Sequence, residues 1–487
     1  MLSGCTQELA RVNVFYEHER LLTSQIIGKG ESIWDHYFHH HPEVVEDGRN
    51  GDIASDSYNL YQRDVEMLRE LGVDHYRFSI AWSRILPTGL VNDVNEKGVQ
   101  YYENLIEKLL KYNIEPVVTL YHMDLPQYLQ DMGGWVNPLS VDWFEDYARI
   151  IFDKFANRVK YWVTINQPCN ICIDGYGSTH VAPALGKSGV ADYVCMKNIL
   201  LAHAKAYRLY EKDYKSKYNG LVGIALFMSW ADAVNNKTEN MEAVDTYREF
   251  RLGMYMDPIW STDGDFPKKV KDIVAKKSRE QGFSRSRLPE LTAKEKKLVK
   301  GSADFLGVNH YTTFLVERSK KQHPTPSFAD DVNVDISHDK NWKVSKSSWL
   351  ASVPYGLYRI CLYINLKYNY PKMFITEHGW STGPGLGDQS RVDNMSKYMN
   401  ALLIALEDGT DLIGYTAWSL MDNVEWTAGT SERFGLYEVN FESDAKTRTA
   451  RLSAFFYKHL IEKRTVDENF KPASLIMEIS DMKRKER

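Results

Sequence analysis

The chain has 487 residues, of which 43% are hydrophobic and 26% are charged, and its formal net charge is −5 at pH 7. This length suits either several ordinary domains or one large barrel, and the apolar content is ample for a large core. A small negative charge spread along the chain gives no reason to expect a nucleic acid or an anionic membrane as partner. No apolar run approaches the roughly 18 residues of a membrane span.

The start of the chain bears on where the protein works. Charged side chains are scattered through residues 1–27, so this segment lacks the apolar stretch of a signal peptide. We therefore expect a cytoplasmic protein by default, with secretion as the alternative if this N-terminal segment is aberrant. Two acceptor triplets for N-linked glycans, Asn236-Lys-Thr and Asn394-Met-Ser, matter only if the protein is secreted.

Strand-like segments recur along the whole chain. They are His75–Trp82, Glu115–His122, Tyr161–Asn166, Leu221–Trp230, Asp304–Tyr311, Met373–Thr376 and Leu412–Ser419. These runs are short, rich in β-branched or aromatic residues, and not alternating. Such a pattern is typical of strands that are buried on both faces.

Helix-like segments lie between the strands. Ser57 to Leu71 has its leucines and Val65 on one side and is followed by Gly72, a common helix stop. Similar patterns span Gly98–Tyr112, Val141–Ala156 and Asp192–Tyr214. Strands that alternate with helices indicate parallel βαβ units, and no long linker divides them, so we expect one domain. The polar stretch Ser319–Ser348 predicts a long, lid-like surface loop.

The alternation leaves two architectures open, a doubly wound sheet and an eightfold barrel. No G-x-G-x-x-G follows any strand, which argues against a dinucleotide fold. Polar and aromatic residues stand at the strand ends, where a barrel places its catalytic groups. They are Arg77, His122, Asn166, Gln167, Asn309, Tyr311, Glu377 and Trp418. The sequence therefore favours an α/β fold of the (β/α)8 TIM-barrel type. Only seven strands are found, so the first, which should precede Gly28, is degenerate or missing.

The cysteines and potential metal ligands give little direction. The cysteines are Cys5, Cys169, Cys172, Cys195 and Cys361, which form no even framework. Cys169 and Cys172 make a C-x-x-C motif, but no second pair follows it, so a redox or zinc function is the minor alternative. No spacing of His, Cys, Asp and Glu indicates a metal site.

Eight motifs, in this order along the chain, resemble those of family 1 glycoside hydrolases, the β-glucosidases and myrosinases (thioglucosidases). The sequence is most similar to the insect branch of that family. The motifs are Gly28-Lys-Gly-Glu-Ser-Ile-Trp-Asp35, Tyr76-Arg-Phe-Ser79, His122-Met-Asp-Leu-Pro126, Thr164-Ile-Asn-Gln-Pro168, Asn309-His-Tyr311, Ile375-Thr-Glu-His-Gly379, Trp418-Ser-Leu-Met-Asp-Asn423 and Glu425-Trp426. The resemblance implies a (β/α)8 barrel that cuts β-D-glucosides with retention. It divides the chain into an atypical N-terminal segment (1–27), the barrel (28–465) and a C-terminal tail (466–487).

The resemblance also implies roles for individual residues. Glu377 matches the family nucleophile, and Arg77 and Tyr311 match the groups that hold and tune it. A nearby guanidinium lowers the pKa of a carboxyl group and keeps it ionised. The residues that match the sugar pocket are His122, Asn166, Trp418, Glu425 and Trp426. The Glu425-Trp426 pair indicates a neutral sugar rather than a 6-phosphorylated one.

Gln167 is the departure that matters most, because most family members have the acid/base glutamate at this position. A retaining glycosidase needs one carboxylate as nucleophile and a second as acid/base. An amide cannot transfer the proton, and such help is worth about 10²–10⁴-fold in rate. Plant myrosinases of the family also have Gln here and use ascorbate as an external base, whereas the insect branch generally keeps Glu.

Three smaller departures follow. Residues 1–27 do not match the family's first strand or its glucose-binding Gln. Thr23-Ser-Gln25-Ile26 is at most a fragment of that strand, and residues 11–27 could improvise one with Val12, Val14 and Phe15 as its apolar face. Met123 replaces the usual Trp beside His122, and His378 replaces the usual Asn after Glu377. We expect both to reshape the pocket wall.

Three hypotheses follow. The first is an active hydrolase of O- or S-linked β-D-glucosides with good leaving groups. The second is a glucoside-binding pseudoenzyme, and the third is a transglucosidase whose glucosyl-enzyme waits for an acceptor better than water. All three take a small-molecule β-glucoside as partner. None needs a metal or resident cofactor, and the first admits an external base such as ascorbate.

Overall fold

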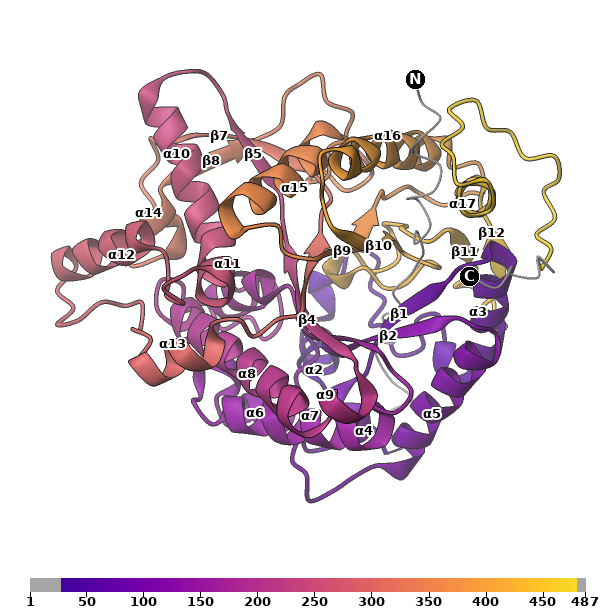
Figure 1. The fold of residues 1–487 in the computed structure, drawn as a ribbon, viewed down its shortest axis with the longest axis horizontal. Coiled ribbons are helices and arrows are strands. Elements are labelled where there is room, and N and C mark those ends of the chain that lie inside the picture. Colours follow the sequence, from indigo (N-terminus) through magenta and orange to yellow (C-terminus); the bar gives the residue numbers. More distant parts are fainter. Residues whose placement is uncertain (1–27, 480–487) are drawn as a thin grey trace.

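The computed structural model describes residues 28–479 of the chain. Its centre is a parallel sheet that curls into a nearly closed barrel, with helices around the outside (Figure 1). The strands lie in the order β1-β2-β3-β4-β6-β9-β10, and neighbours are parallel throughout. They are β1 His75–Ser79, β2 Glu115–Tyr121, β3 Tyr161–Asn166, β4 Leu221–Phe227, β6 Phe305–Asn309, β9 Met373–Gly379 and β10 Leu412–Trp418. The predicted (β/α)8 fold is confirmed, and all seven predicted strands contribute to the sheet, although the fourth is shorter than predicted.

The first and last of these strands come close together. His75 Nε2 of β1 lies 3.2 Å from Thr416 Oγ1 of β10, so the seven strands curve almost full circle. The residues predicted to supply a first strand, Val12, Val14 and Phe15, lie outside the described residues. So does the fragment around Gln25.

Helices connect the strands on the outside of the barrel. They are α2 Ile33–His40, α3 Ser57–Leu71, α4 Trp82–Ile85, α5 Glu96–Lys111, α6 Gln127–Asp131, α7 Ser140–Phe155, α8 Ala191–Asp213, α9 Lys215–Tyr218, α10 Thr238–Arg248, α11 Met254–Trp260, α12 Lys268–Glu280, α13 Ala293–Val299, α14 Phe328–Val332, α15 Tyr355–Tyr368, α16 Gln389–Glu407 and α17 Leu452–Lys463. The four predicted helices appear as α3, α5, α7 and α8. Helix α3 ends where predicted, because Gly72 takes φ 74° and its N–H bonds to the carbonyl of Leu68.

Two predictions about irregular segments are wrong in part. The predicted strand Leu221–Trp230 is broken after Phe227, and a separate strand β5 (Trp230–Ala233) pairs with β7 (Thr313–Arg318). The predicted loop Ser319–Ser348 contains α14 and β8 (Val334–Ser337), which pairs with β7. Buried Phe328 and Val332 anchor this region, although they are too few to give a readable pattern. The remaining strands, β11 Tyr437–Val439 and β12 Arg448–Ala450, form an antiparallel pair.

The interior of the barrel is filled by side chains rather than open. One buried cluster takes a residue from each of β2, β3, β4, β6 and β9, namely Val117, Val163, Ala225, Phe305 and Phe374. Such layers are the usual core of this fold. Polar groups therefore gather beyond this apolar layer, toward the carboxyl ends of the strands.

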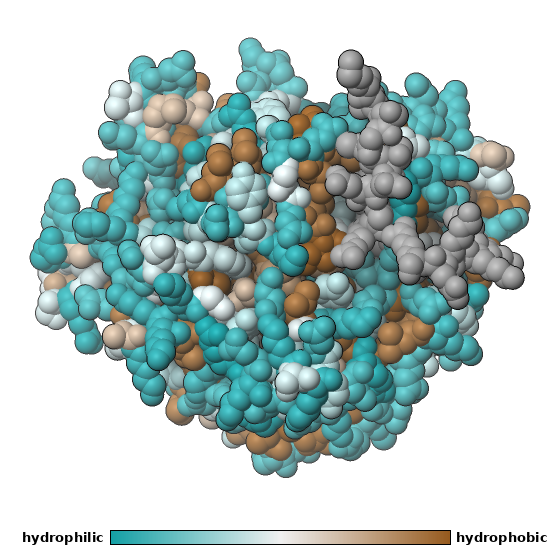
Figure 2. Space-filling model, viewed as in Figure 1, coloured by the Kyte–Doolittle hydropathy of each residue, from teal (hydrophilic) through white to brown (hydrophobic). Residues whose placement is uncertain are grey.

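The outer surface is mainly hydrophilic on the face drawn in Figure 2. Among residues 28–479, none of the helices combines the length and the apolar character needed to cross a bilayer.

One disulfide corrects the prediction from the cysteines. Cys172, in a helical turn η4 (Asn170–Gly177), is bonded to Cys195 of α8. Cys169 and Cys361 are free and buried. The two cysteines of the C-x-x-C motif are therefore not bonded to each other. Cys172 in η4 is bonded to α8, while Cys169 Sγ accepts a hydrogen bond from Arg251 at 3.2 Å.

Candidate active site

Polar residues from distant parts of the sequence converge at the carboxyl ends of the strands. Arg77 comes from β1, Asn166 ends β3, Asn309 ends β6, and Glu377 lies near the end of β9. All four are buried, with Arg77 and both asparagines fully enclosed. The predicted strand-end residues thus form one site.

The carboxylate of Glu377 is held by hydrogen bonds from several side chains. Arg77 Nη1 donates to Oε1 at 2.9 Å. Tyr311 OH donates to Oε2 at 3.0 Å, and Gln167 Nε2 donates to the same oxygen at 3.2 Å. Glu377 is only 3% exposed, so these contacts replace the water that a surface carboxylate would have. The arrangement fixes the carboxylate in one orientation.

A second ring of contacts fixes Arg77 and the asparagines. Asn166 Oδ1 accepts from Arg77 Nη2 at 2.8 Å and from Asn309 Nδ2 at 2.9 Å. Thr376 Oγ1 donates to Asn309 Oδ1 at 2.6 Å. Consecutive residues Thr376 and Glu377 both join this network, where the pairing of β6 with β9 shifts register. The sequence reasoning did not assign Thr376 a role, although a Thr before each polar strand end was visible.

Burial raises the pKa of Glu377 above its ordinary value, while the charge and hydrogen bonds of Arg77 and the bonds from Tyr311 and Asn166 oppose the rise. Arg77 does lower the pKa of Glu377, as predicted. The predicted net direction is wrong, because desolvation raises this pKa by more than Arg77 lowers it. Burial, then the charges of Glu377 and Glu425, raise the pKa of Tyr311 well above its ordinary value. Tyr311 therefore stays protonated and donates a hydrogen bond to Glu377.

Gln167 directly follows β3 and has an unusual backbone. Its φ is 50°, in the left-handed region that residues with a side chain rarely adopt. Its backbone N–H bonds to the carbonyl of Ala225 at 2.8 Å. Such conformations persist where the surroundings enforce them, often at functional sites. The side chain is thereby aimed at Glu377.

The predicted sugar-pocket residues lie beside this centre. Asn166 Nδ2 is 3.1 Å from His122 Nε2. The ring of His122 is parallel to Trp418 at 6.3 Å and to Trp426 at 6.2 Å, measured between ring centroids. Glu425 precedes Trp426 and is close enough to raise the pKa of Tyr311. Aromatic faces beside hydrogen-bonding groups suit a pyranose ring.

An aromatic wall that the sequence reasoning missed stands beside Tyr311. Trp349 is 41% exposed, and its ring centroid lies 5.6 Å from Tyr311 and 6.5 Å from Phe227. Phe434 lies 6.3 Å from Tyr311 on another side. The sequence signal that could have indicated this wall is that Trp349 directly follows the polar stretch Ser319–Ser348. These rings offer an apolar surface next to the residues predicted to bind the sugar.

The two smaller substitutions have different outcomes. Met123 is buried with φ 66°, and its carbonyl accepts a hydrogen bond from Trp34 Nε1 at 3.1 Å, next to the site. His378 points away from the pocket, so its expected effect on the pocket wall is wrong. Its Nδ1 lies 2.6 Å from Tyr415 OH, and its ring packs on Tyr398 of α16 at 4.3 Å. Burial lowers the pKa of His378 to about 3, so it is neutral.

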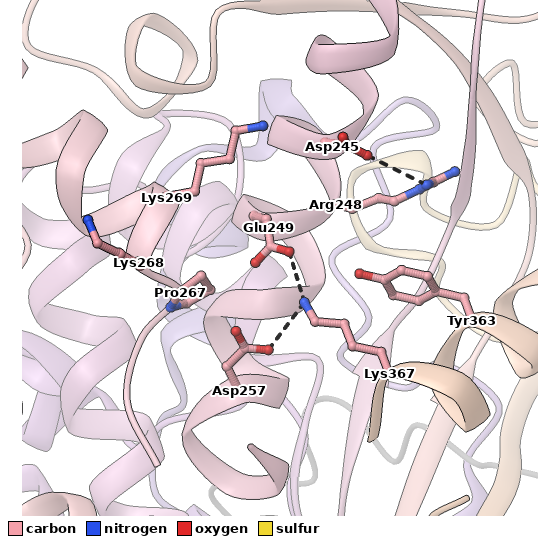
Figure 3. A pocket seen from close by; sticks show the side chains of 9 residues that line it. All are labelled: Asp245, Arg248, Glu249, Asp257, Pro267, Lys268, Lys269, Tyr363 and Lys367. Carbon is pink, nitrogen blue, oxygen red and sulfur yellow. Dashed lines mark hydrogen bonds and ion pairs between the residues drawn. The ribbon is translucent and has the colours of Figure 1, made fainter. Parts of the chain in front are cut away.

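No group of three or more His, Cys, Asp or Glu placed to hold a metal ion occurs in residues 28–479. A separate hollow of about 470 Å³ lies outside the barrel and is lined by residues of α10, α11, α12 and α15 (Figure 3). Its central cation, Lys367, is paired with Glu249 at 2.9 Å and Asp257 at 3.3 Å. None of the predicted site residues lines it.

Comparison with known proteins places the chain among glycosidases. Residues 24–466 match the model of glycosyl hydrolase family 1. The chain is 41% identical to Myrosinase 1 of Brevicoryne brassicae over 437 residues, covering 89% of this chain and 93% of that protein. It is 37% identical to the human cytosolic β-glucosidase over 444 residues, covering 90% and 94%.

Solved structures agree with the sequence matches. An aphid myrosinase superimposes with a TM-score of 0.89 at 40% identity, covering 93% of this chain and 98% of that one. A rice β-glucosidase, a Glu-to-Gln mutant in covalent complex with glucose, superimposes with a TM-score of 0.87 at 36% identity, with the same coverage.

Proposed function

The chain belongs to glycosyl hydrolase family 1, and from this premise we propose that it cleaves O- or S-linked β-D-glucosides whose leaving groups depart without a proton. Family membership makes it a glycoside hydrolase that acts on small glucosides. The narrower proposal concerns the substrates that its site can still convert. It rests on one observation, the amide of Gln167 at 3.2 Å from the carboxylate of Glu377.

In the first step Glu377 attacks the anomeric carbon of the glucoside. A bond forms between a carboxylate oxygen and C1, and the bond from C1 to the leaving oxygen or sulfur breaks with its electron pair. Arg77, 2.9 Å from Oε1, favours the ionised form of the carboxylate against the effect of burial. Tyr311 and Gln167 orient the other oxygen. The product is a covalent glucosyl-enzyme, as in retaining glycosidases.

The amide of Gln167 decides which leaving groups succeed. It has no acidic proton to give, so an alkoxide would leave without help, at a cost of about 10²–10⁴ in rate. A phenolate or thiolate-type leaving group is stable as an anion and needs little protonation. The aphid and Brevicoryne relatives are myrosinases by name, which supports S-linked substrates, and the human relative, a β-glucosidase, supports O-linked ones.

The second step is the slow one in this proposal. Water must give up a proton as it attacks the glucosyl-enzyme, and Gln167 cannot accept it. The rice β-glucosidase with a Glu-to-Gln change holds glucose covalently, and this supports accumulation of the same species here. An external base such as ascorbate, or an anionic nucleophile, would release the sugar.

The sugar is a neutral glucose in this proposal. Glu425 can accept two adjacent hydroxyls, and His122 and Asn166 add further polar contacts at the pocket. Trp418 and Trp426 offer ring faces to the apolar side of the sugar. Trp349 and Phe227 then form a wall for an aromatic aglycone.

The test is nitrophenol release from a dinitrophenyl β-glucoside, with and without azide. We expect a burst of about one equivalent, followed by a slow phase that azide converts into steady turnover with β-glucosyl azide as product. Gln167→Glu is the matched control and should turn over without azide. Glucosinolates and aryl glucosides, each with and without ascorbate, then separate S- from O-linked preference.

Other outcomes favour the alternatives. Glucoside transfer to an added alcohol, with little hydrolysis, identifies a transglucosidase. Absence of a burst and of azide rescue in folded protein, together with saturable glucoside binding, would reject catalysis and identify a sugar-binding pseudoenzyme.

A further inference from the structure

The disulfide between Cys172 and Cys195 is buried in the core. Both residues are 0% exposed, and their Cα atoms are 5.5 Å apart, within the common range for such bonds. Cys172 lies in η4, which follows β3 and Gln167, and Cys195 lies on α8. Disulfides persist in oxidising compartments and are rare where glutathione keeps thiols reduced. The bond is therefore a first indication of the compartment in which the chain folds.

An exposed glycan acceptor is a second and independent indication. Asn236 lies in the bend between β5 and α10, and Asn236, Lys237 and Thr238 are all exposed. The neighbouring Asn235 Oδ1 accepts from Lys237 N at 3.1 Å and from Asn240 Nδ2 at 3.0 Å. These bonds order the bend and leave the acceptor triplet open to a bulky group.

The second triplet serves as an internal contrast. Asn394 lies within α16 and is 3% exposed. Its Oδ1 accepts from Ser352 Oγ at 2.6 Å, and its Nδ2 lies 3.4 Å from His378 Nε2. A glycan at this position would have no room in the folded protein. Only one of the two triplets is compatible with a modified native state.

We propose that this protein matures in an oxidising, secretory compartment, where Cys172 and Cys195 are joined and Asn236 carries an N-linked glycan while Asn394 does not. The cytoplasmic expectation rested on residues 1–27, which lie outside the described residues. The proposal uses instead two features of the barrel itself. It does not depend on the proposed catalytic function, because neither feature touches the reacting groups.

Each modification needs one co-reactant, an oxidant for the disulfide and a glycosyl donor for the glycan. The two thiols lose two protons and two electrons to the disulfide of a thiol–disulfide oxidoreductase, which becomes a dithiol. The amide nitrogen of Asn236 forms a bond to C1 of the first sugar of a lipid-diphosphate oligosaccharide. It loses a proton, and the lipid diphosphate leaves.

The test is peptide mapping of the full protein isolated from its own tissue. Free thiols are alkylated without reductant, and the digest is analysed before and after treatment with peptide N-glycosidase. We expect the peptides of Cys172 and Cys195 to remain joined, with Cys169 and Cys361 alkylated. The Asn236 peptide should appear only after glycosidase treatment, with its asparagine converted to aspartate. Unmodified Asn236 in the untreated digest, or alkylated Cys172, would overturn the proposal.

Variants of the full chain, expressed behind a secretion leader, isolate the site. Asn236→Gln and Thr238→Ala remove the same triplet through different residues, so both should lose the shift in gel migration that glycosidase produces. Ser396→Ala removes the other triplet with a small change and should leave that shift unchanged. If Asn236→Gln retained the full shift, or if Ser396→Ala lost it, the glycan would not be on Asn236. Either result would reject the proposal.

Discussion

At the residue scale, the proposed mechanism depends most on the hydrogen bond that Gln167 Nε2 donates to Glu377 Oε2 at 3.2 Å. In a retaining glycosidase the second carboxyl group lies about 5–5.5 Å from the nucleophile and shuttles a proton. An amide at this position orients the nucleophile but transfers no proton. Under the proposed function, the chain therefore retains the attacking group and its supports, and lacks the group that assists departure and hydrolysis.

Gln167→Glu should restore that proton transfer. We expect hydrolysis of an alkyl β-glucoside, whose leaving group needs a proton, to accelerate about 10²–10⁴-fold. The rate of the first step with a dinitrophenyl glucoside should change far less. The measurement is kcat/KM for both substrates. Equal effects on the two substrates would mean that Gln167 does not occupy the acid/base position.

The pH dependence of the first step follows from Glu377. Burial raises its pKa above the ordinary 4.5, with Arg77 opposing the rise. Only the ionised form attacks, so the burst rate should increase as pH rises through a midpoint above 4.5. It should then stay flat, because no second carboxyl group must remain protonated. Arg77→Gln should move the midpoint to higher pH, and a lower midpoint in that variant would contradict this assignment.

At the element scale, the segment after β8 presents Trp349 next to the site. The ring lies 5.6 Å from Tyr311 and is 41% exposed, so it has a free face. Trp349→Ala should raise KM for aryl glucosides by about 3–10-fold, because aromatic pairs contribute about 0.5–1.5 kcal/mol beyond area burial. The kcat with the same substrates should change less, and Trp349→Phe should retain most of the affinity. An unchanged KM would remove Trp349 from the aglycone wall.

The end of α3 gives a matched pair of glycine variants. Gly72 has φ 74°, and nothing lies within 4 Å of an added Cβ. Gly72→Ala should therefore destabilise the fold by about 1–2 kcal/mol through backbone strain alone. Gly383 also has open space and no positive φ, so Gly383→Ala should leave stability nearly unchanged. Equal denaturant midpoints for the two variants would refute this interpretation.

At the scale of the whole molecule, the barrel was predictable because its strands are continuous apolar runs that end in polar groups. Residues such as Asn166, Asn309 and Glu377 fall at or near those ends, and a parallel barrel must bring them together. The net pKa direction of Glu377 was not predictable, because it depends on burial by the complete fold. Nor were the partners of His378, because Tyr398 and Tyr415 come from other elements that pack against β9.

The partner of Cys172 was also hidden from the sequence. Its bond to Cys195 spans 23 residues and depends on how η4 packs against α8. The neighbouring Cys169 gave a familiar local spacing that the fold does not use. Likewise, the sparse apolar residues Phe328 and Val332 did not reveal that α14 and β8 interrupt the predicted loop. Local patterns predicted the regular layers of the barrel, while contacts between distant segments determined the rest.

The most direct test of the account is mass spectrometry of the protein quenched in acid shortly after mixing with a dinitrophenyl β-glucoside. We predict that the peptide containing Glu377 gains the mass of one glucosyl residue, that this adduct disappears when azide is present, and that it does not accumulate in Gln167→Glu. A protein that binds the glucoside but never carries glucose on Glu377 would contradict the account.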